Sequence, residues 1–366
     1  MSTLQFHDLR VKDIRQETPD CVSIAFDVPE TLQETYNYLP GQYLTFKTIL
    51  DGQEVRRSYS ICSGKCDNEL RVAVKNVNPP GKFSTWANTA LKVGDLVSVM
   101  PPLGNFTPKP SDKKQRNYVA FSAGSGITPI MSIMKEVLYN EPSSTFTLVF
   151  GNYNRGSIIF KEELEALKNR FMSRLRLFHV MNKESQEAVL LNGIITAEKA
   201  KSFQDLKLIN YQAIDDVFIC GPEPMIVALK DYFLNEVNIP AERVYFELYC
   251  SPDQPKKVNK EWEDKQQLVD RSKVAKVTVK LDGNSFDMDL AFGGENILDA
   301  ALQNGGDLPY ACKGGVCCTC KAKLVSGEVD MEVNYGLEPD EIANNFILTC
   351  QAHPRSEHVV VDFDIK

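Results

Sequence analysis

Four cysteines near the C-terminus constrain this chain more than any other feature. Cys312, Cys317 and Cys320 have the spacing C-x4-C-x2-C, and Cys350 follows at a distance. One loop must then bring three thiolates to a single small cluster, and two adjacent glycines within it allow the backbone to approach closely. This spacing predicts a [2Fe–2S] site with these four cysteines as its metal ligands.

Two other uses of the cysteines fit the pattern less well. A structural zinc site usually shows two short pairs of ligands, whereas here the fourth cysteine stands alone. A disulfide framework suits small secreted chains, and this chain has 366 residues. Cys318 lies between two predicted ligands, so we expect its side chain to face away from the cluster and to pack as a thiol.

The length and composition indicate a soluble protein of two or three domains. No apolar run approaches the roughly 18 residues that span a bilayer, so no membrane partner is expected. Residues 1–14 carry charges throughout and lack an apolar stretch, which argues against a signal peptide. Ten cysteines without export predict reduced thiols in the cytoplasm.

Acidic charge is concentrated at the C-terminal end of the chain. Residues 273–366 carry 15 Asp and Glu side chains against 8 Lys and Arg, in a chain of net charge −8. This balance argues against nucleic acid as a partner. It is compatible with docking to a basic surface and equally with a role in solubility, and the sequence leaves both open.

Residues 1–110 alternate short apolar runs with turn signals, which predicts an antiparallel β-barrel or sandwich. Strands are expected at 21–26 and 43–46. Two motifs stand out in this region. Residues 57–60 read R-x-Y-S at a strand edge, and residues 81–84 begin a helix whose first amides could bind a phosphate.

Residues 111–250 change to strands that alternate with helices, which predicts an α/β doubly wound parallel sheet. An apolar strand at 118–123 leads into Gly124-Ser125-Gly126, and Thr128 is the expected N-cap of a helix over 130–139. Further strands are expected at 146–150, 175–180, 217–220 and 244–248, and helices at 160–171 and 225–235. Such a strand–turn–helix unit can hold a pyrophosphate, although it lacks the full G-x-G-x-x-G.

The two N-terminal motifs, in this order, resemble the flavin site of the ferredoxin–NADP reductase family. The resemblance implies that Arg57 holds a flavin phosphate, that Tyr59 packs on the flavin and that Ser60 hydrogen-bonds near its reactive N5 edge. It implies further flavin contacts from an intermediate strand and from the helix start, namely Val74, Lys75, Gly81, Lys82, Phe83 and Ser84. The choice of FAD over FMN comes from this resemblance alone.

The same family resemblance extends to the nicotinamide side of the site. Cys220-Gly221-Pro222 matches the family's turn beside the nicotinamide and implies that Cys220 lies close to the carbon that gives up hydride. Glu247 and Tyr249 match the segment that approaches the flavin, although many relatives have Phe at the second position. Residues predicted to bind the dinucleotide are Gly124, Gly126, Thr128, Cys220, Gly221 and Pro222.

The end of the second predicted parallel strand indicates which nicotinamide cofactor is used. A site for NAD tends to place a carboxylate on the ribose 2′-OH, and a site for NADP tends to place an arginine there. No acidic residue occurs between Gly151 and Phe160, whereas Arg155 and Ser157 could hold a 2′-phosphate. The sequence therefore favours NADPH.

Residues 251–272 are polar and poor in apolar side chains, which is typical of a linker, with a short helix possible at 260–269. Residues 273–366 begin with a hairpin around Asp282-Gly283-Asn284 and continue with a helix at 296–303 before the cysteine loop. Over its whole length this last region resembles the β-grasp fold, an α+β fold, of plant-type ferredoxins.

The combined resemblance implies an electron-transfer component of an oxygenase. Electrons would pass from NADPH to FAD, to the [2Fe–2S] cluster and then to a diiron oxygenase; residues 327–331 with Asn334 and Tyr335 are similar to one such group. A reductase for another oxygenase, hydroxylase or desaturase is an alternative. A non-enzymatic [2Fe–2S] carrier or sensor is a second, and the flavin and nicotinamide motifs argue against it.

Overall fold

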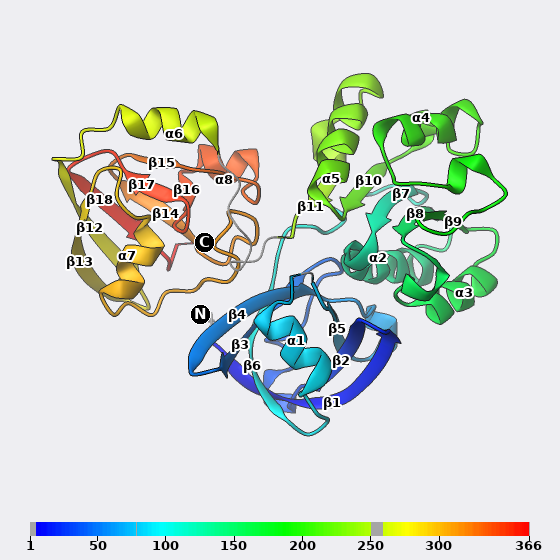
Figure 1. Cartoon of the computed structure of the whole chain (residues 1–366), viewed down its shortest axis with the longest axis horizontal. Helices are drawn as coiled ribbons and strands as arrows, with labels where there is room; N and C mark the ends of the chain where they lie inside the picture. The colour runs from blue at the N-terminus through cyan, green and yellow to red at the C-terminus, as the bar shows by residue number, and fades with distance from the viewer. Residues whose placement is uncertain (1–4, 78, 250–258, 366) are drawn as a thin grey trace. The chain divides into compact units, whose positions relative to one another are not determined.

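Three sheets of five or six strands organise the chain (Figure 1). The computed structural model describes residues 5–77, 79–249 and 259–365. These divide into two compact units, one formed by most of residues 6–249 and the other containing residues 259–365. The first unit holds the six-stranded sheet and one five-stranded sheet, and the second holds the other five-stranded sheet.

The six-stranded sheet forms the predicted antiparallel barrel. Its strands are β1 (His7–Thr18), β2 (Cys21–Asp27), β3 (Tyr43–Leu50), β4 (Gln53–Ser60), β5 (Leu70–Lys75) and β6 (Leu96–Leu103), in the order β4-β3-β6-β1-β2-β5. Ile61, directly after β4, bridges Val72 of β5, so the two edge strands meet and the sheet closes. Apolar side chains that alternate along the strands, such as Leu44 and Phe46, fill the interior. Helix α1 (Lys82–Thr89) follows β5.

The five-stranded sheet of the first unit is parallel and doubly wound, as predicted. Its elements are β7 (Asn117–Ala123), α2 (Ile127–Asn140), β8 (Thr145–Asn152), α3 (Lys161–Arg170), β9 (Leu175–Met181), α4 (Ala197–Asp205), β10 (Asp216–Cys220), α5 (Glu223–Asp231) and β11 (Val244–Glu247). The strand order is β11-β10-β7-β8-β9. Helices α2 and α3 cover one face and α4 and α5 the other (Figure 1). Burial on both faces explains the continuous apolar strands.

Helix α2 begins earlier than the sequence predicts, and the expected N-cap at Thr128 is wrong. Residues Gly124–Gly126 already form a 3-10 turn, η3, and Gly126 precedes the first residue of the helix, Ile127. Thr128 therefore lies in the first helical turn, where its hydroxyl donates to the carbonyl oxygen of Ser125 at 3.0 Å. The glycines allow a tight turn that continues directly into the helix.

The second unit has the mixed sheet of a β-grasp fold. Its elements are β12 (Val274–Leu281), β13 (Asn284–Ala291), α7 (Ile297–Gln303), β14 (Lys321–Ser326), β15 (Val329–Met331), α8 (Pro339–Ala343), β16 (Phe346–Leu348), β17 (Ala352–Pro354) and β18 (His358–Asp362). Strands β12 and β18 pair in parallel, whereas β12–β13 and β14–β18 are antiparallel. In the predicted hairpin turn, Asp282 and Gly283 both have positive φ, as a two-residue type I′ turn requires.

The polar stretch predicted as a linker contains helix α6 (Lys260–Gln267). Its N-cap is Asn259, whose side chain also donates to the carbonyl oxygen of Glu332 at 2.9 Å. The ring of Trp262 packs on His353 at a centroid distance of 4.9 Å. The described end of this stretch thus packs on the second unit, while residues 251–258 of the predicted linker lie outside the described residues.

Candidate functional site

The four predicted cluster ligands lie in two pairs. The side chain of Cys312 is hydrogen-bonded to that of Cys317, and the side chain of Cys320 to that of Cys350. The first pair comes from the loop after α7, whereas the second joins the end of this loop to the residue that follows β16 by two positions. Three of the four side chains are buried, and Cys317 is half-buried.

Backbone amides point at the sulfur atoms of this loop. The amides of Gly314 and Cys317 donate to the Sγ atom of Cys312 at 3.3 and 3.4 Å. The hydrogen bond with the Cys317 side chain and those from the amides lower the pKa of Cys312 to about 6, whereas burial alone would raise it. Amide donors that favour a thiolate are the environment that an iron–sulfur cluster requires.

The shape of the loop depends on backbone that approaches closely. Gly315 has φ +74°, and a Cβ atom there would lie 3.0 Å from Val333. A Cβ atom at Gly336 would lie 2.5 Å from the Sγ atom of Cys318. Cys318 thus packs against the neighbouring segment and the hydrophobic core, as expected for a cysteine that packs as a thiol.

The donor set, two pairs of thiols, fits a [2Fe–2S] cluster. In the described part of the chain, no group of three or more Cys, His, Asp or Glu side chains is placed to hold one ion. Two pairs of thiols, each suited to one iron atom, are what a two-iron cluster with four cysteines needs.

The predicted flavin strand is β4, and the ring of its Tyr59 packs against two phenylalanine rings. The ring of Tyr59 lies 5.4 Å from that of Phe83 and 6.0 Å from that of Phe46. The side chain of Phe83 is itself buried in the barrel core, where it supports the ring of Tyr59. Arg57, two residues before Tyr59 on the same strand, is half-buried.

The N-terminus of α1 fits a phosphate. Gly81 is the N-cap and offers no side chain to bond the first amides of the helix. The ammonium group of Lys82 donates to Gln53 of β4 at 2.6 Å, which ties this helix end to the flavin strand. The Ser84 hydroxyl donates to the carbonyl oxygen of Gly81 at 3.2 Å.

Two predicted flavin residues end strand β5. The side chain of Val74 is fully buried in the barrel core, so any contact that it makes with a flavin has to use its backbone. Lys75 is half-buried, and its Nζ atom lies 3.5 Å from a carboxylate oxygen of Asp20.

A polar cluster joins the barrel to the carboxyl end of the parallel sheet. The Ser60 hydroxyl donates to Oε2 of Glu247 at 3.0 Å and lies 3.2 Å from the hydroxyl of Tyr249. The Tyr249 hydroxyl is also 3.1 Å from Oγ1 of Thr128. Cys220 completes the cluster, because its thiol is hydrogen-bonded to Tyr249. Five residues that are far apart in sequence therefore meet at one place.

Burial determines the protonation of Glu247 and Cys220 in this polar cluster. Cys220 is fully buried and lies beside Glu247 on the neighbouring strand. Burial raises the pKa of Glu247 to about 7, although its bonds to Ser60 and Tyr249 oppose this rise. Burial likewise raises the pKa of the Cys220 thiol well above its usual value, so this cysteine is a neutral thiol.

Two glycines let the strand ends of the parallel sheet pack together. A Cβ atom at Gly126 would lie 2.1 Å from the carbonyl oxygen of Cys220. One at Gly221 would lie 2.7 Å from Met225 and 3.1 Å from the amide nitrogen of Ala123. The turns after β7 and β10 are therefore in direct contact, and both leave backbone amides at the edge where doubly wound sheets bind dinucleotides.

The predicted 2′-phosphate residues lie in a separate group. Arg155 is exposed, and its side chain and backbone amide both bond the carboxylate of Glu184. The Ser157 hydroxyl donates to the carbonyl oxygen of Asn154 at 2.8 Å. Sequence reasoning missed Glu184, which follows β9. Neighbouring parallel strands end at the same sheet edge, so a search beyond β8 would have found it.

The ammonium groups of two lysines lie near the ring of an exposed tyrosine, close in sequence to Arg155. The ammonium group of Lys183 lies 4.8 Å from the ring centre of Tyr153, and that of Lys75 lies 6.0 Å from it. Tyr153 is 53% exposed, so its ring is available for stacking. Arg155 is two residues further along the chain.

Comparison with known protein families assigns all three regions. Residues 8–107 match an oxidoreductase FAD-binding domain, residues 121–231 an oxidoreductase NAD-binding domain, and residues 279–355 a 2Fe-2S iron-sulfur cluster binding domain. None of the helices in the described ranges combines the length and apolar character that crossing a lipid bilayer requires.

Similar proteins match this chain over nearly their full length. The chain is 42% identical to a subunit of the 1,2-phenylacetyl-CoA epoxidase of Escherichia coli (strain K12), over 99% of this chain and 98% of that protein. It is 33% identical to the ferredoxin reductase component of 3-ketosteroid-9-alpha-monooxygenase of Rhodococcus rhodochrous, over 97% and 96%. The solved structure of phthalate dioxygenase reductase superposes with a TM-score of 0.57 at 22% identity, over 98% of both chains, and shows the same fold.

Proposed function

Because the chain belongs to the family of oxygenase reductases with FAD, NAD and [2Fe–2S] domains, we propose that NADPH is its electron donor and a diiron oxygenase its acceptor. When bound, FAD takes a hydride from NADPH, and the [2Fe–2S] cluster passes electrons on singly. The protein supplies the positions and the electrostatic environment of these groups.

One observation carries the proposal for the hydride step. Ser60 ends the predicted flavin strand, Cys220 ends the strand before the predicted nicotinamide turn, and both contact the segment of Glu247 and Tyr249. The flavin edge and the nicotinamide would thus meet beside the polar cluster of Ser60, Cys220, Glu247 and Tyr249. Ser60 would hydrogen-bond the flavin near N5, and Tyr59 would pack on its ring.

The flavin phosphates and the pyrophosphate of NADPH would be bound at two separate places. Arg57 and the amides of residues 81–84 would hold the flavin phosphates, since guanidinium groups and helix N-termini both favour such anions. The turns at residues 124–126 and 220–222 would hold the pyrophosphate of NADPH against their backbone amides.

The preference for NADPH over NADH is supported by two cations, Arg155 after β8 and Lys183 after β9. Arg155 and Lys183 would bind the 2′-phosphate, and Tyr153 would stack on the adenine. Glu184 is the opposing feature, because it already neutralises the Arg155 guanidinium. A phosphate with close to two negative charges competes for the arginine better than a ribose hydroxyl does.

We infer that the oxygenase is a phenylacetyl-CoA epoxidase, because the relative at 42% identity is a component of that enzyme. The other oxygenase reductases, at 33% identity and below, support the alternative that the acceptor is another monooxygenase. In either case Cys312, Cys317, Cys320 and Cys350 would hold the [2Fe–2S] cluster through which electrons leave the protein.

Reconstitution with purified oxygenases tests this function. The reductase is combined with the oxygenase subunits of phenylacetyl-CoA epoxidase or with the oxygenase component of 3-ketosteroid-9-alpha-monooxygenase, and NADPH-dependent product formation is measured. We expect turnover with the first and little with the second. Turnover only with the second would show that the inferred partner is wrong. A lack of NADPH oxidation with ferricyanide as acceptor would contradict the reductase function itself.

A further inference from the structure

Helix α2 carries a buried polar stripe whose role the proposed chemistry does not explain. Thr128, Ser132 and Lys135 follow one another at intervals of four and three residues, so they lie on one side of the helix. Their exposed fractions are only 3%, 0% and 4%. Buried polar groups cost free energy unless they are paired, so the partners of this stripe indicate what it does.

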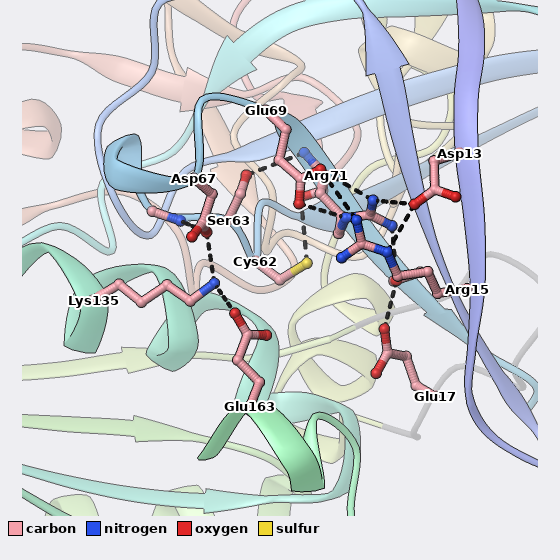
Figure 2. A network of polar contacts seen from close by, with 12 residues as sticks. Asp13, Arg15, Glu17, Cys62, Ser63, Asp67, Glu69, Arg71, Lys135 and Glu163 are labelled. Carbon is pink, nitrogen blue, oxygen red and sulfur yellow. Dashed lines mark hydrogen bonds and ion pairs between the residues drawn. The ribbon is translucent and has the colours of Figure 1, made fainter. Parts of the chain in front are cut away.

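Two residues of the stripe bind the loop that follows the flavin strand β4, residues 61–67. The Ser132 hydroxyl donates to the carbonyl oxygen of Ser63 at 2.6 Å. The ammonium group of Lys135 donates to Oδ2 of Asp67 at 2.6 Å (Figure 2). The 61–67 loop belongs to the barrel, whereas α2 belongs to the parallel sheet.

The third residue of the stripe reaches the flavin strand itself through one intermediate. The Tyr249 hydroxyl lies 3.1 Å from Oγ1 of Thr128 and 3.2 Å from Oγ of Ser60. The order of Thr128, Ser132 and Lys135 along the helix is thus the order of their partners along the chain, from Ser60 through the 61–67 loop. One face of α2 is paired with β4 and its continuation over two helical turns.

The 61–67 loop is fixed on its other side by the barrel. The amide of Arg71 donates to the Ser63 hydroxyl at 3.1 Å, and the Cys62 thiol donates to the Arg71 carbonyl oxygen at 3.4 Å. The buried Arg71 guanidinium in turn bonds Asp13 at 2.6 Å and Glu69 at 2.8 Å (Figure 2). A contact made by the loop with α2 is therefore transmitted to the barrel.

Lys135 is built to remain charged in this contact. Burial alone would lower its pKa, but Glu163 of α3 and Asp67 reverse this effect and raise the pKa well above its usual value. Both carboxylates bond the Lys135 ammonium group. The packing is also close, because a Cβ atom at Gly64 would lie 2.7 Å from the Cβ atom of Lys135.

We propose that Lys135 and Ser132 are positioning residues for hydride transfer, because they hold the loop after the flavin strand against helix α2. This inference rests on the proposed function. The N-terminus of α2 continues directly from the glycine turn that would hold the dinucleotide. A helix is stiff over seven residues, or about 10 Å, so its register at Lys135 sets the position of that turn relative to Ser60.

Rapid-mixing experiments with the FAD-loaded full-length protein test the proposal. Lys135→Met and Ser132→Ala are compared with the unmutated protein under anaerobic conditions, and flavin reduction is followed at saturating NADPH. We expect Lys135→Met to slow this step by about 10- to 100-fold, because a misplacement of about 1 Å can cost that much. Ser132→Ala should slow it less, because Tyr38 still donates to the Ser63 carbonyl oxygen.

A matched variant separates positioning from general loss of structure. Lys199 of α4 is half-buried, and its ammonium group donates to the carbonyl oxygens of Leu190 and Asn192 in its own domain. Lys199→Met should leave the saturating rate unchanged. Hydrogen exchange gives a readout other than activity, since amides of the 61–67 loop should exchange faster in the Lys135 and Ser132 variants and normally in the Lys199 variant.

The outcomes distinguish this inference from the function on which it rests. Unmutated protein whose flavin is not reduced by NADPH would contradict the proposed function, and hydrogen exchange would then still test the contact. Variants at Lys135 and Ser132 that retain FAD, the normal saturating rate and normal exchange would overturn the positioning role. If Lys135→Met does not fold, an unchanged rate and exchange in Ser132→Ala overturn it equally.

Discussion

Gly126 and Cys220 are so close that a Cβ atom on the glycine would lie 2.1 Å from the carbonyl oxygen of the cysteine. Because the obstacle is backbone, it cannot be relieved by a change of rotamer. Gly126→Ala should therefore push the turns after β7 and β10 apart and destabilise the fold by roughly 1–3 kcal/mol, as overpacking does. NADPH-dependent flavin reduction should fall while FAD content is retained.

Gly151→Ala is the control for this prediction. Its added Cβ atom would lie 3.2 Å from the flexible end of Ile195, which can move. Thermal denaturation and flavin reduction by NADPH are measured for both variants. Equal, near-normal behaviour of Gly126→Ala and Gly151→Ala would contradict the importance of the close approach.

Cys320→Ser should remove the visible absorbance of the cluster and leave the flavin in place, because a hard hydroxyl replaces a soft thiolate. Cys318→Ser should keep the cluster, since this side chain packs against Gly336 and the core. Iron and acid-labile sulfide are measured in both proteins. Normal contents in Cys320→Ser would refute its assignment as a ligand.

Glu247 makes stability depend on pH in a defined direction. Its pKa is raised to about 7 in the folded protein from an ordinary value of 4.5, so the folded state binds the proton more tightly than the unfolded state. Stability should therefore fall as the pH rises from 4.5 through 7 and then level off. Glu247→Gln should remove this fall, with a gain of at most about 3 kcal/mol at pH 8 and little change near pH 4.5.

Denaturant unfolding of the two proteins at pH 5 and pH 8 checks the prediction for Glu247. The difference in the free energy of unfolding between variant and unmutated protein should be larger at pH 8. A larger difference at pH 5, or the same difference at both values, would mean that the carboxyl group is not held protonated by burial.

Arg155→Ala should narrow the preference for NADPH over NADH. A charge-assisted contact with the 2′-phosphate contributes about 1.5–3 kcal/mol, so kcat/KM for NADPH should fall by roughly 10- to 100-fold while that for NADH changes little. Glu184→Gln should act in the opposite direction, because it frees the guanidinium that Glu184 now bonds. Equal use of both nucleotides by the unmutated protein would overturn the proposed preference.

A chain truncated after Pro252 should separate flavin chemistry from electron delivery. It retains the unit that contains the barrel and the parallel sheet, and we expect it to fold. It should reduce ferricyanide with NADPH at close to the full-length rate, because this acceptor takes electrons from the flavin. It should fail to support the oxygenase, because the cluster is absent.

Adding residues 273–366 as a separate protein should restore only part of the oxygenase turnover. The covalent connection gives the cluster a high effective concentration at the flavin, and separation removes it. Full turnover with the truncated chain alone would show that the flavin donates to the oxygenase directly.

Local patterns in the sequence determined the class of each domain. Hydrophobic spacing of two residues predicted the barrel strands, and alternation of strands with helices predicted the parallel sheet. Asp282-Gly283 predicted the hairpin, because both positions need positive φ. The cysteine spacing predicted the cluster loop for a similar reason, since three ligands must come from one short segment.

The predicted start of helix α2 was wrong, because the glycine motif before it could either precede the helix as a separate turn or continue directly into it. Thr128 is a good N-cap residue by type, but the preceding glycine turn had already adopted helical geometry. Capping preferences describe the residue at a helix boundary, and here the boundary depended on how Gly126 packed against the turn after β10.

Tertiary structure alone decided which distant residues meet. Ser60 and Glu247 are 187 positions apart, and they are in contact because the barrel closes and β11 lies at the sheet edge next to β10. Glu184 reaches Arg155 because β8 and β9 are neighbours and end together. The pairing of Lys135 with Asp67 likewise needs helix and barrel to be in place. Spacing along the chain encodes turns and faces, whereas such contacts depend on strand order and on the packing of one sheet against another.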